Sequence, residues 1–568
     1  MTLRIPKELR SYQFDKLTGV ELNDFDVDRF LPVLFEMVET KGRRLARSNA
    51  DPADPDRYIE ALAAHPNLHG FDDEHGRAVL KQWVDSSVVR LGHIGRSHRD
   101  VQLAAVQPIH IGAYRAGLPV EGTRHRKVHL VVYRLLKEAL LRRGATDPER
   151  TLQRLFREAF GRGVAIDAQF VPAFDGKADD LDANVLLSLY YLEGFQPGKV
   201  LTRRTELDWS PVMPGLMISL GDLLLDFLTV YRNRLPTIAL ARHLAALLNI
   251  GLFTMTLRLF SVVGELCRGG NGGAGGNGGN RGNGGNGAAR PLPADLSRDL
   301  RPARTEIYVD FTRQTGGDSD RLAGECVARD LERLPAYFEN MILLKTLDRY
   351  ASSEQKLRPY VEGRRGPDWL VALVGIRDLE YVEWRAGLDL ERIIDTTRAE
   401  LRMSEDEARA ELASLAPGGS QLDLLLAAIR QSQASKAVTS AGSWLWNTGG
   451  LRKQAGLLRG NLHGRRAWRY AMTDELLTTM LLTTLMDRET GAPAPRMRLA
   501  DLLDTLEHRW GLLIHRPPAA RDDASSRAVA SQNLAAFTGR LHQMGFFADL
   551  ADDFNAQYVI NPLAGARR

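Results

Sequence analysis

Cysteine is almost absent from this sequence. Cys267 and Cys326 are the only two among 568 residues, and they form no C-x-x-C pair. A secreted disulfide framework or a structural zinc site needs more cysteines than this. The first ten residues, MTLRIPKELR, also lack the apolar stretch of a signal peptide. We therefore expect a cytoplasmic protein.

The sequence has no uninterrupted hydrophobic run long enough to cross a membrane. Its most apolar region, 211–263, is broken by charged residues that include Asp222, Asp226 and Arg258. The longest uncharged run in that region, 244–257, has 14 residues, whereas a membrane-spanning helix needs about 20. This pattern predicts buried core helices and no membrane partner.

Nucleotide-binding and catalytic motifs are missing as well. The segment 194–200, GFQPGKV, resembles a P-loop, but it is one residue short. Val200 stands where a P-loop has the Ser or Thr that holds magnesium. No G-x-S-x-G, kinase or dinucleotide-binding motif is present. We predict no catalytic residue and no cofactor.

Three acids come closest to a metal-dependent nuclease site: Asp368, Glu380 and Glu383. Such a site usually has a lysine after the second acid, but this chain reads Glu-Trp-Arg at 383–385. Surface acids near a helix start explain the same residues. A divergent nuclease that uses these three carboxylates remains one alternative function.

Histidines cluster between His65 and His129, with two pairs spaced as zinc ligands on a helix would be. In the first pair, His65 and His69, Pro66 disfavours a helix. The second pair, His125 and His129, lies among cations and has no carboxylate beside it. We therefore predict a polar basic surface and no metal site.

Glycine and asparagine dominate one segment, 269–287, which reads GGNGGAGGNGGNRGNGGNG. Such a composition cannot build a core and is typical of a flexible linker. We predict a helical N-terminal domain at 1–268, a linker at 269–289, a mostly helical domain at 290–495 with a basic tract at 430–470, and a last domain at 496–568.

Hydrophobic residues recur with helical spacing over most of the chain. The expected helices include 28–38, 128–141, a helix capped by Asp147, and 216–263. Beyond the linker, a strand at 306–311 precedes helices near 321–350, 389–412 and 420–434, whereas 368–376 fits a strand or a helix equally well. The fold class is therefore mainly α and multi-domain.

The last seventy residues predict a winged-helix-like α+β domain. A helix at 499–510, a short strand at 512–514, a helix at 526–544 and a hairpin at 546–560 follow one another. The presumed recognition helix has few cations, and the presumed wing carries Asp549, Asp552 and Asp553. Because these acids repel DNA, the domain is expected to dock a protein partner.

Acidic residues are absent between Asp423 and Asp474, where cations and aromatic residues alternate. Unpaired cations bind phosphates, and exposed aromatic rings stack on bases. The predicted phosphate contacts are Arg452, Lys453, Arg459, Arg465, Arg466 and Arg469, with Trp446 and Trp468 as stacking residues. The alternative is a solvated loop whose tryptophans belong to the core and whose arginines pair with acids elsewhere.

Two stretches resemble a known group of proteins. They are 101–119, VQLAAVQPIHIGAYRAGLP, and 511–562, which contains GLLIHRPP and NLAAFTGRLHQMGFF. Both resemble accessory proteins of bacterial anti-phage defence islands, in particular of the methylation-associated defence system. The resemblance implies a multi-gene system whose methyltransferase, nuclease, ATPase and kinase activities lie in other subunits.

We therefore predict a non-catalytic subunit of an antiviral defence system. It is expected to bind DNA or RNA, to bridge other subunits, or both. A pure protein scaffold without nucleic-acid binding is the second alternative function.

Overall fold

The computed structural model of the chain describes residues 3–10, 12–45, 55–93, 102–116, 125–177, 181–193, 200–204, 207, 209–269, 305–461, 467–548 and 557–565. Helices predominate in this part of the chain, as predicted, and the strands are short. The predicted linker lies outside the described residues, apart from Gly269, the last residue of a helix.

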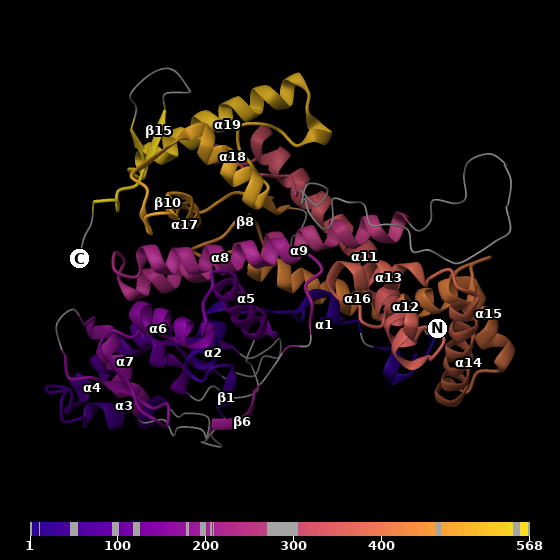
Figure 1. Cartoon of the computed structure of the whole chain (residues 1–568), viewed down its shortest axis with the longest axis horizontal. Helices are drawn as coiled ribbons and strands as arrows, with labels where there is room; N and C mark the ends of the chain where they lie inside the picture. Colours follow the sequence, from indigo (N-terminus) through magenta and orange to yellow (C-terminus); the bar gives the residue numbers. More distant parts are fainter. Residues whose placement is uncertain are drawn as a thin grey trace.

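Two long apolar helices, α8 (Pro214–Tyr231) and α9 (Thr237–Gly269), run through the middle of the molecule (Figure 1). Both are long and apolar enough to cross a membrane by composition alone. In α9, however, 94% of the most apolar stretch is buried inside the protein. A helix enclosed by other helices is apolar on all sides for that reason.

The N-terminal elements lie on one side of α8 and α9 (Figure 1). Three of their helices match the predicted ranges closely: α2 (Val27–Glu39), α5 (Val128–Arg142) and α6 (Pro148–Phe160). Asp147 accepts a hydrogen bond from Arg150 N and caps α6, as its position before a proline indicated. The other elements are η1 (Lys7–Leu9), α1 (Asp15–Thr18), β1 (Arg43–Leu45), α3 (Pro55–Ala63), α4 (Glu74–Trp83), η2 (Val84–Val88), β2 (Val89–His93), β3 (Gln102–Val106), η3 (Ile111–Ala116), β4 (Val164–Ile166), β5 (Pro172–Phe174), α7 (Ala183–Glu193) and β6 (Val200–Arg204).

The chain beyond 305 begins with β7 (Ile307–Tyr308) and the helix α11 (Asp318–Ser353). The undecided segment 368–376 is helical and belongs to α13 (Gly366–Gly375). The helix expected over 389–412 is instead two, because Arg402 adopts a left-handed φ of 56° and Ser404 caps the next helix. This region also contains α12 (Arg358–Val361), α14 (Glu380–Leu401), α15 (Glu405–Leu415), α16 (Gln421–Thr448), β8 (Leu458–Arg459) and β9 (Arg469–Tyr470).

The C-terminal elements cover the opposite side of α8 and α9 (Figure 1). They are α17 (Asp474–Thr484), β10 (Met486–Asp487), β11 (Ala492–Pro493), β12 (Arg496–Arg498), α18 (Leu499–Trp510), β13 (Leu512–Leu513), η6 (Ala519–Arg521), α19 (Ala524–Gln543), β14 (Phe547–Ala548) and β15 (Tyr558–Ile560). An antiparallel sheet has the strand order β12-β15-β14, and β13 pairs in parallel with β7. The presumed wing, 549–556, lies outside the described residues.

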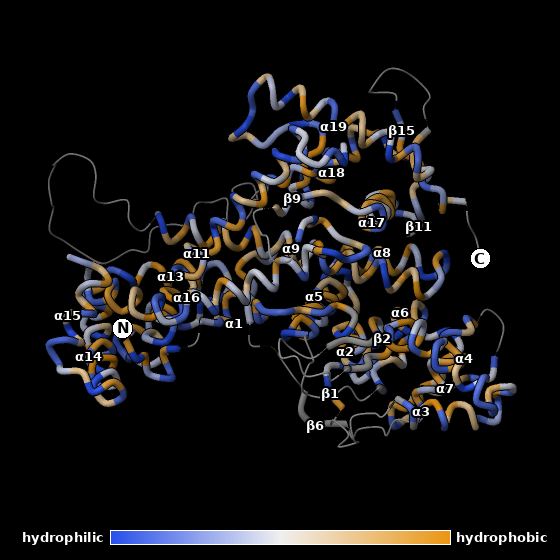
Figure 2. The backbone as a smooth tube through the Cα atoms, turned by 180° about the vertical axis from the view of Figure 1, so that it is seen from behind, coloured by the Kyte–Doolittle hydropathy of each residue, from blue (hydrophilic) through white to orange (hydrophobic). Residues whose placement is uncertain are grey.

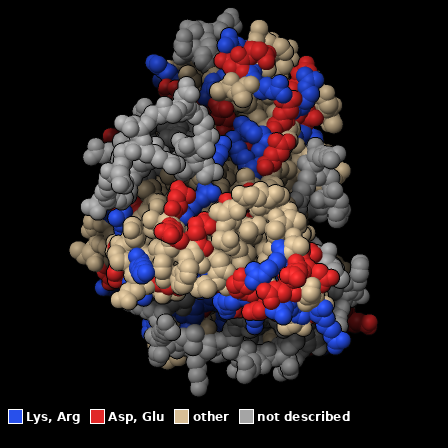
Figure 3. Space-filling view, turned by 90° about the vertical axis from the view of Figure 1, so that its right-hand side faces the viewer, with Lys and Arg blue, Asp and Glu red and all other residues tan. Residues whose placement is uncertain are grey.

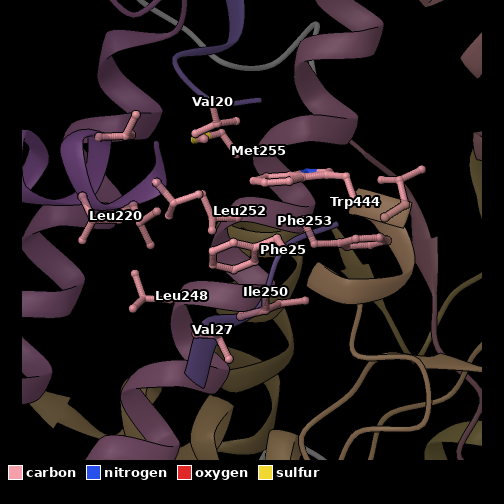
Figure 4. Close-up of a cluster of buried hydrophobic side chains, with 14 of the residues drawn as sticks. Val20, Phe25, Val27, Leu220, Leu248, Ile250, Leu252, Phe253, Met255 and Trp444 are labelled. Carbon is pink, nitrogen blue, oxygen red and sulfur yellow. The ribbon is translucent and has the colours of Figure 1, made fainter. Parts of the chain in front are cut away.

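One large cluster of buried hydrophobic residues extends from Leu3 to Val559 and joins all these parts. Most helices carry both hydrophobic and hydrophilic residues (Figure 2). This pattern is typical of helices that bury one face. Near the centre, Phe25 and Trp444 from distant parts of the sequence lie beside Phe253 of α9 (Figure 4). The Phe25 and Trp444 ring centroids are 5.5 Å apart.

Candidate nucleic-acid interface and the adjoining cleft

The basic tract begins on a helix and continues into a tightly folded loop, 449–461. Asp423, the last acid before the tract, is used in the capping box that Ser420 forms at the start of α16. After α16, a Cβ atom on Gly456 would lie 2.1 Å from the carbonyl oxygen of Gly450. Gly450 and Gly456 therefore let the loop close on itself.

The loop is anchored to the start of α17. The Thr473 hydroxyl accepts hydrogen bonds from Gly456 N at 3.0 Å and from Leu476 N at 3.2 Å, and it caps the helix. The backbone N–H of Thr473 in turn donates to Gly456 O at 2.9 Å. This double attachment fixes the loop relative to α17.

Arg452 and Arg459 are the two most accessible cations of the loop. Both side chains are exposed, and neither makes an ion pair with a described residue. Arg452 has a left-handed φ of 60°, and its guanidinium donates to Asn461 Oδ1 at 3.3 Å. A non-glycine residue in this conformation is held there by its surroundings. Lys453, the next residue, is half-buried.

Other cations of the tract are neutralised within the fold. Arg469 forms an ion pair with Asp320 at the start of α11, and Arg430 pairs with Glu339 at 2.6 Å. Because the charge of Arg469 is matched by an internal carboxylate, this residue is not part of the interface proposed below. Arg465 and Arg466 lie outside the described residues.

The tryptophans of the tract face inward. Trp468 is 1% exposed, and its indole N–H donates to Asn461 O at 2.7 Å. The Trp468 ring therefore has no solvent-facing surface on which a base could stack, and it is not part of the interface proposed below. Trp446 is half-buried and meets Trp468 edge-on at 6.4 Å. The two rings pack against each other, and Trp468 is hydrogen-bonded to the last residue of the loop, Asn461.

A cleft of about 480 Å³ lies beside the loop and is shared by both halves of the chain. Arg452 and Lys453 line it from the C-terminal half, together with Glu475 at the start of α17. Arg242 and Asn249 line it from α9. Asp85 and Ser86 of η2, a single turn of π-helix, complete its polar wall; such turns are often found at functional sites.

The cleft residues outside the basic tract were not predicted. Asp85, Arg242, Asn249 and Glu475 are far apart in the sequence, and only the tertiary fold brings them together. One signal was present for Asn249, a polar residue inside the 14-residue uncharged run 244–257. A buried polar residue within an apolar helix needs a partner or a function.

Other candidate sites do not assemble in the described part of the chain. No group of three or more His, Cys, Asp or Glu residues there could hold a metal ion. Asp368 and Glu380 are exposed near the starts of α13 and α14, and Glu383 accepts a hydrogen bond from Leu422 N at 3.2 Å. The three acids of the nuclease alternative therefore do not converge.

Two histidines of this cluster, His110 and His129, are buried in the protein interior. His110 is fully buried and contacts Ser188 Oγ at 2.8 Å, and burial lowers its pKa to about 3. Its Nδ1 accepts from Gly112 N at 3.1 Å, so Nε2 carries the proton and cannot act as a base toward Ser188. Burial also lowers the pKa of His129, whose ring meets that of His125 at 4.3 Å.

Charges of both signs lie on the face of the molecule that Figure 3 shows. On the face shown in Figure 3, Lys and Arg lie interspersed with Asp and Glu around an area of uncharged residues. Among the described residues visible on this face, Lys and Arg form no continuous patch. On this face, a nucleic-acid contact would therefore depend on a few locally unpaired cations.

Comparison with known proteins identifies the family. The family model described as methylation-associated defense system protein MAD7 matches residues 7–563. The chain belongs to the MAD7 family. The match includes both halves and confirms the resemblance to defence-system proteins found in the sequence. No curated protein and no solved structure gives a significant match to this MAD7-family chain.

Proposed function

We propose that this MAD7-family protein is a non-catalytic, cytoplasmic component of its defence system that binds nucleic acid through the loop 449–461. Arg452, Lys453 and Arg459 provide the phosphate contacts. The observation that carries the proposal is the contrast within the tract: Arg430 and Arg469 are neutralised by acids of α11, whereas Arg452 and Arg459 have no ion-pair partner among the described residues. Unpaired cations on a fixed loop can release counterions when they meet phosphate.

We further propose that α18, α19 and the sheet β12-β15-β14 form a winged-helix unit that docks a protein partner. In this sheet β15, the last strand of the sequence, lies between β12 and β14. Two cations of α19 are already paired, Arg527 with Asp522 at 2.6 Å and Arg540 with Asp474. Because these charges are matched internally, this helix is better suited to a protein surface than to DNA.

The first test measures binding of the full-length protein to labelled single- and double-stranded DNA at several salt concentrations, without magnesium. The test variant combines Arg452→Glu, Lys453→Glu and Arg459→Glu. Each lost phosphate contact should lower the log–log salt slope on duplex DNA by about 0.9, so the triple variant should lose roughly 2–3 units and bind more weakly.

The control variant combines Lys7→Glu, Arg364→Glu and Arg402→Glu. These three residues are exposed and make no ion pair with a described residue, and the net charge changes by the same amount. The control should keep the wild-type slope. Equal slopes for wild type and test variant would refute the proposed interface. Co-purification of partner proteins that survives nuclease treatment would then favour the scaffold alternative.

A further inference from the structure

The cleft beside the loop has an apolar floor and a charged entrance. Six residues of α9 line it, spaced so that they form one face of the helix: Ile238, Ala241, Arg242, Ala245, Ala246 and Asn249. Buried side chains of Leu31 and Ile109 complete the floor. Arg242 is exposed, whereas Asn249, two turns further along α9, is only 5% exposed.

Asn249 is the most informative residue of the cleft. Its Oδ1 is buried and has no hydrogen-bond partner in the described part of the chain. The other buried asparagines differ. Asn533 accepts from Phe311 N and donates to Val309 O and Ile514 O, and Asn561 donates to Tyr231 Oη and Leu485 O.

A carboxamide that lines a cleft and has no partner is suited to a ligand with both a donor and an acceptor. The hydrogen-bonding edge of a nucleobase has this pattern, and asparagine is a usual partner for it. The flat apolar faces of a base also fit the alanine-lined floor of the cleft, which leaves room for a ring.

Arg242 and Asn249 lie on the same face of α9, at a spacing along the helix that suits a nucleotide. Seven residues separate Arg242 from Asn249, which is about 10 Å along a helix. This length is comparable with that of a nucleoside monophosphate from base edge to phosphate. Arg452 and Lys453 line the same cleft from the opposite half, so a phosphate near Arg242 would lie among several cations.

We infer that this cleft binds one nucleotide unit, with the base against Asn249 and the phosphate near Arg242 and Arg452. The carboxylates of Asp85 and Glu475 also line the cleft and can accept hydrogen bonds from sugar hydroxyls. The unit is either a free nucleotide or one nucleotide of a strand. The inference goes beyond the proposed nucleic-acid binding by the loop, although the two share Arg452 and Lys453.

The test uses the full-length protein and isothermal titration calorimetry with AMP, GMP, CMP and UMP. Asn249→Leu keeps the number and branching of the side-chain heavy atoms and removes the hydrogen-bonding groups. It should weaken binding of the preferred nucleotide at least tenfold without lowering the melting temperature, because no bond within the protein is lost. If the Asn249 carboxamide had only a structural role, Asn249→Leu would instead lower the melting temperature and leave the nucleotide affinity unchanged.

A second variant, Arg242→Gln, changes an exposed residue and leaves the buried floor intact. It should weaken binding of the nucleoside monophosphate but not of the matching nucleoside, because only the phosphate contact is lost. The Lys7, Arg364 and Arg402 triple variant serves as the control and should bind nucleotides as the wild type does.

Two arms distinguish the source of the nucleotide. Tight binding of mononucleotides, with single-stranded oligonucleotide affinity unchanged by Asn249→Leu, would indicate a free nucleotide. Weak mononucleotide binding, with oligonucleotide affinity lowered by Asn249→Leu, would indicate one unit of a strand. If neither the mononucleotide affinity nor the oligonucleotide affinity responds to Asn249→Leu or Arg242→Gln, the inference is wrong. This conclusion holds whatever the salt-dependence test of the loop gives.

Discussion

At the scale of single residues, Asp389 shows how this arginine-rich chain uses its charges. Its carboxylate on α14 is fully buried, accepts from the Tyr350 hydroxyl at 2.9 Å and from Arg385 at 3.1 Å, and pairs with Arg349. Burial raises the pKa of Asp389, but the hydrogen bonds and charges of Arg349, Tyr350 and Arg385 together outweigh this effect and leave the pKa below its ordinary value. The network ties α11 to α14.

Replacing this carboxylate should destabilise the protein. Asp389→Asn removes the counter-charge of the partly buried Arg349, whereas Arg385 keeps its ion pair with Glu354. We expect a loss of about 3 kcal/mol in the free energy of unfolding. The measurement is urea unfolding followed by tryptophan fluorescence. Asp395→Asn on the same helix is the control: its side chain is 74% exposed, so the loss should be under about 0.5 kcal/mol.

The same pair of proteins tests the pKa of Asp389. Because the folded-state pKa is lowered, the carboxylate stabilises the fold at neutral pH, and this contribution is lost as the pH falls below about 4 through the folded-state value. The difference in unfolding free energy between wild type and Asp389→Asn should therefore shrink in acid. A difference that stays constant from pH 7 to pH 3 would contradict the assignment.

At the scale of elements, the loop 449–461 depends on the close approach of its own backbone. Besides the contact between Gly450 and Gly456, Gly450 has a left-handed φ of 69°, and a Cβ there would lie 2.6 Å from Ala455 O. The loop positions Arg452 and Lys453 at the cleft. Its shape and its proposed function are therefore linked.

A methyl group at Gly456 should disturb both the shape of the loop and its binding of DNA. Gly456→Ala places a Cβ against backbone that cannot move freely, and we expect a loss of about 1–3 kcal/mol in unfolding free energy together with weaker DNA binding. Gly539→Ala in α19 is the matched control, because nothing lies within 4 Å of its Cβ position. The control should be neutral or stabilise by up to about 1 kcal/mol. Unchanged stability and DNA affinity in Gly456→Ala would argue against a rigid loop.

At the scale of the whole molecule, the two halves of the chain interlock. Several buried hydrogen bonds cross between them: Tyr231 Oη to Leu482 O at 2.9 Å, Trp444 Nε1 to Thr256 Oγ1 at 3.0 Å, and Arg258 to Arg509 O at 2.9 Å. The first residues of the chain also contact the C-terminal half, since Arg4 N donates to Thr397 Oγ1 of α14 at 3.0 Å. The predicted domain limits remain predictions, but the hydrophobic core passes across the first of them.

Cutting the chain between the halves should therefore not separate them. A protease recognition sequence inserted within 270–289 would allow cleavage of the purified protein. We expect both fragments to elute together in size-exclusion chromatography, at the position of the uncut 63.2 kDa chain. Elution as two separate peaks would show that the buried contacts do not hold the halves together without the linker.

The sequence by itself determined the helical class, several helix limits and the family. Apolar spacing and caps are local signals, so α6 began at Pro148 after its Asp147 cap and α18 covered 499–510 as predicted. The same signals failed where periodicity is ambiguous, as in 368–376, or where a left-handed residue divides one helix into two, as at Arg402.

Only the tertiary structure decided which charges are free and which aromatic rings are buried. Arg452 and Arg469 belong to the same acid-free stretch, yet one is exposed and the other is neutralised by Asp320 from α11. The cleft likewise unites Asn249 of α9 with Arg452, about 200 residues away. Ion pairing and burial depend on neighbours in space, and no local pattern in the sequence records which distant element will supply them.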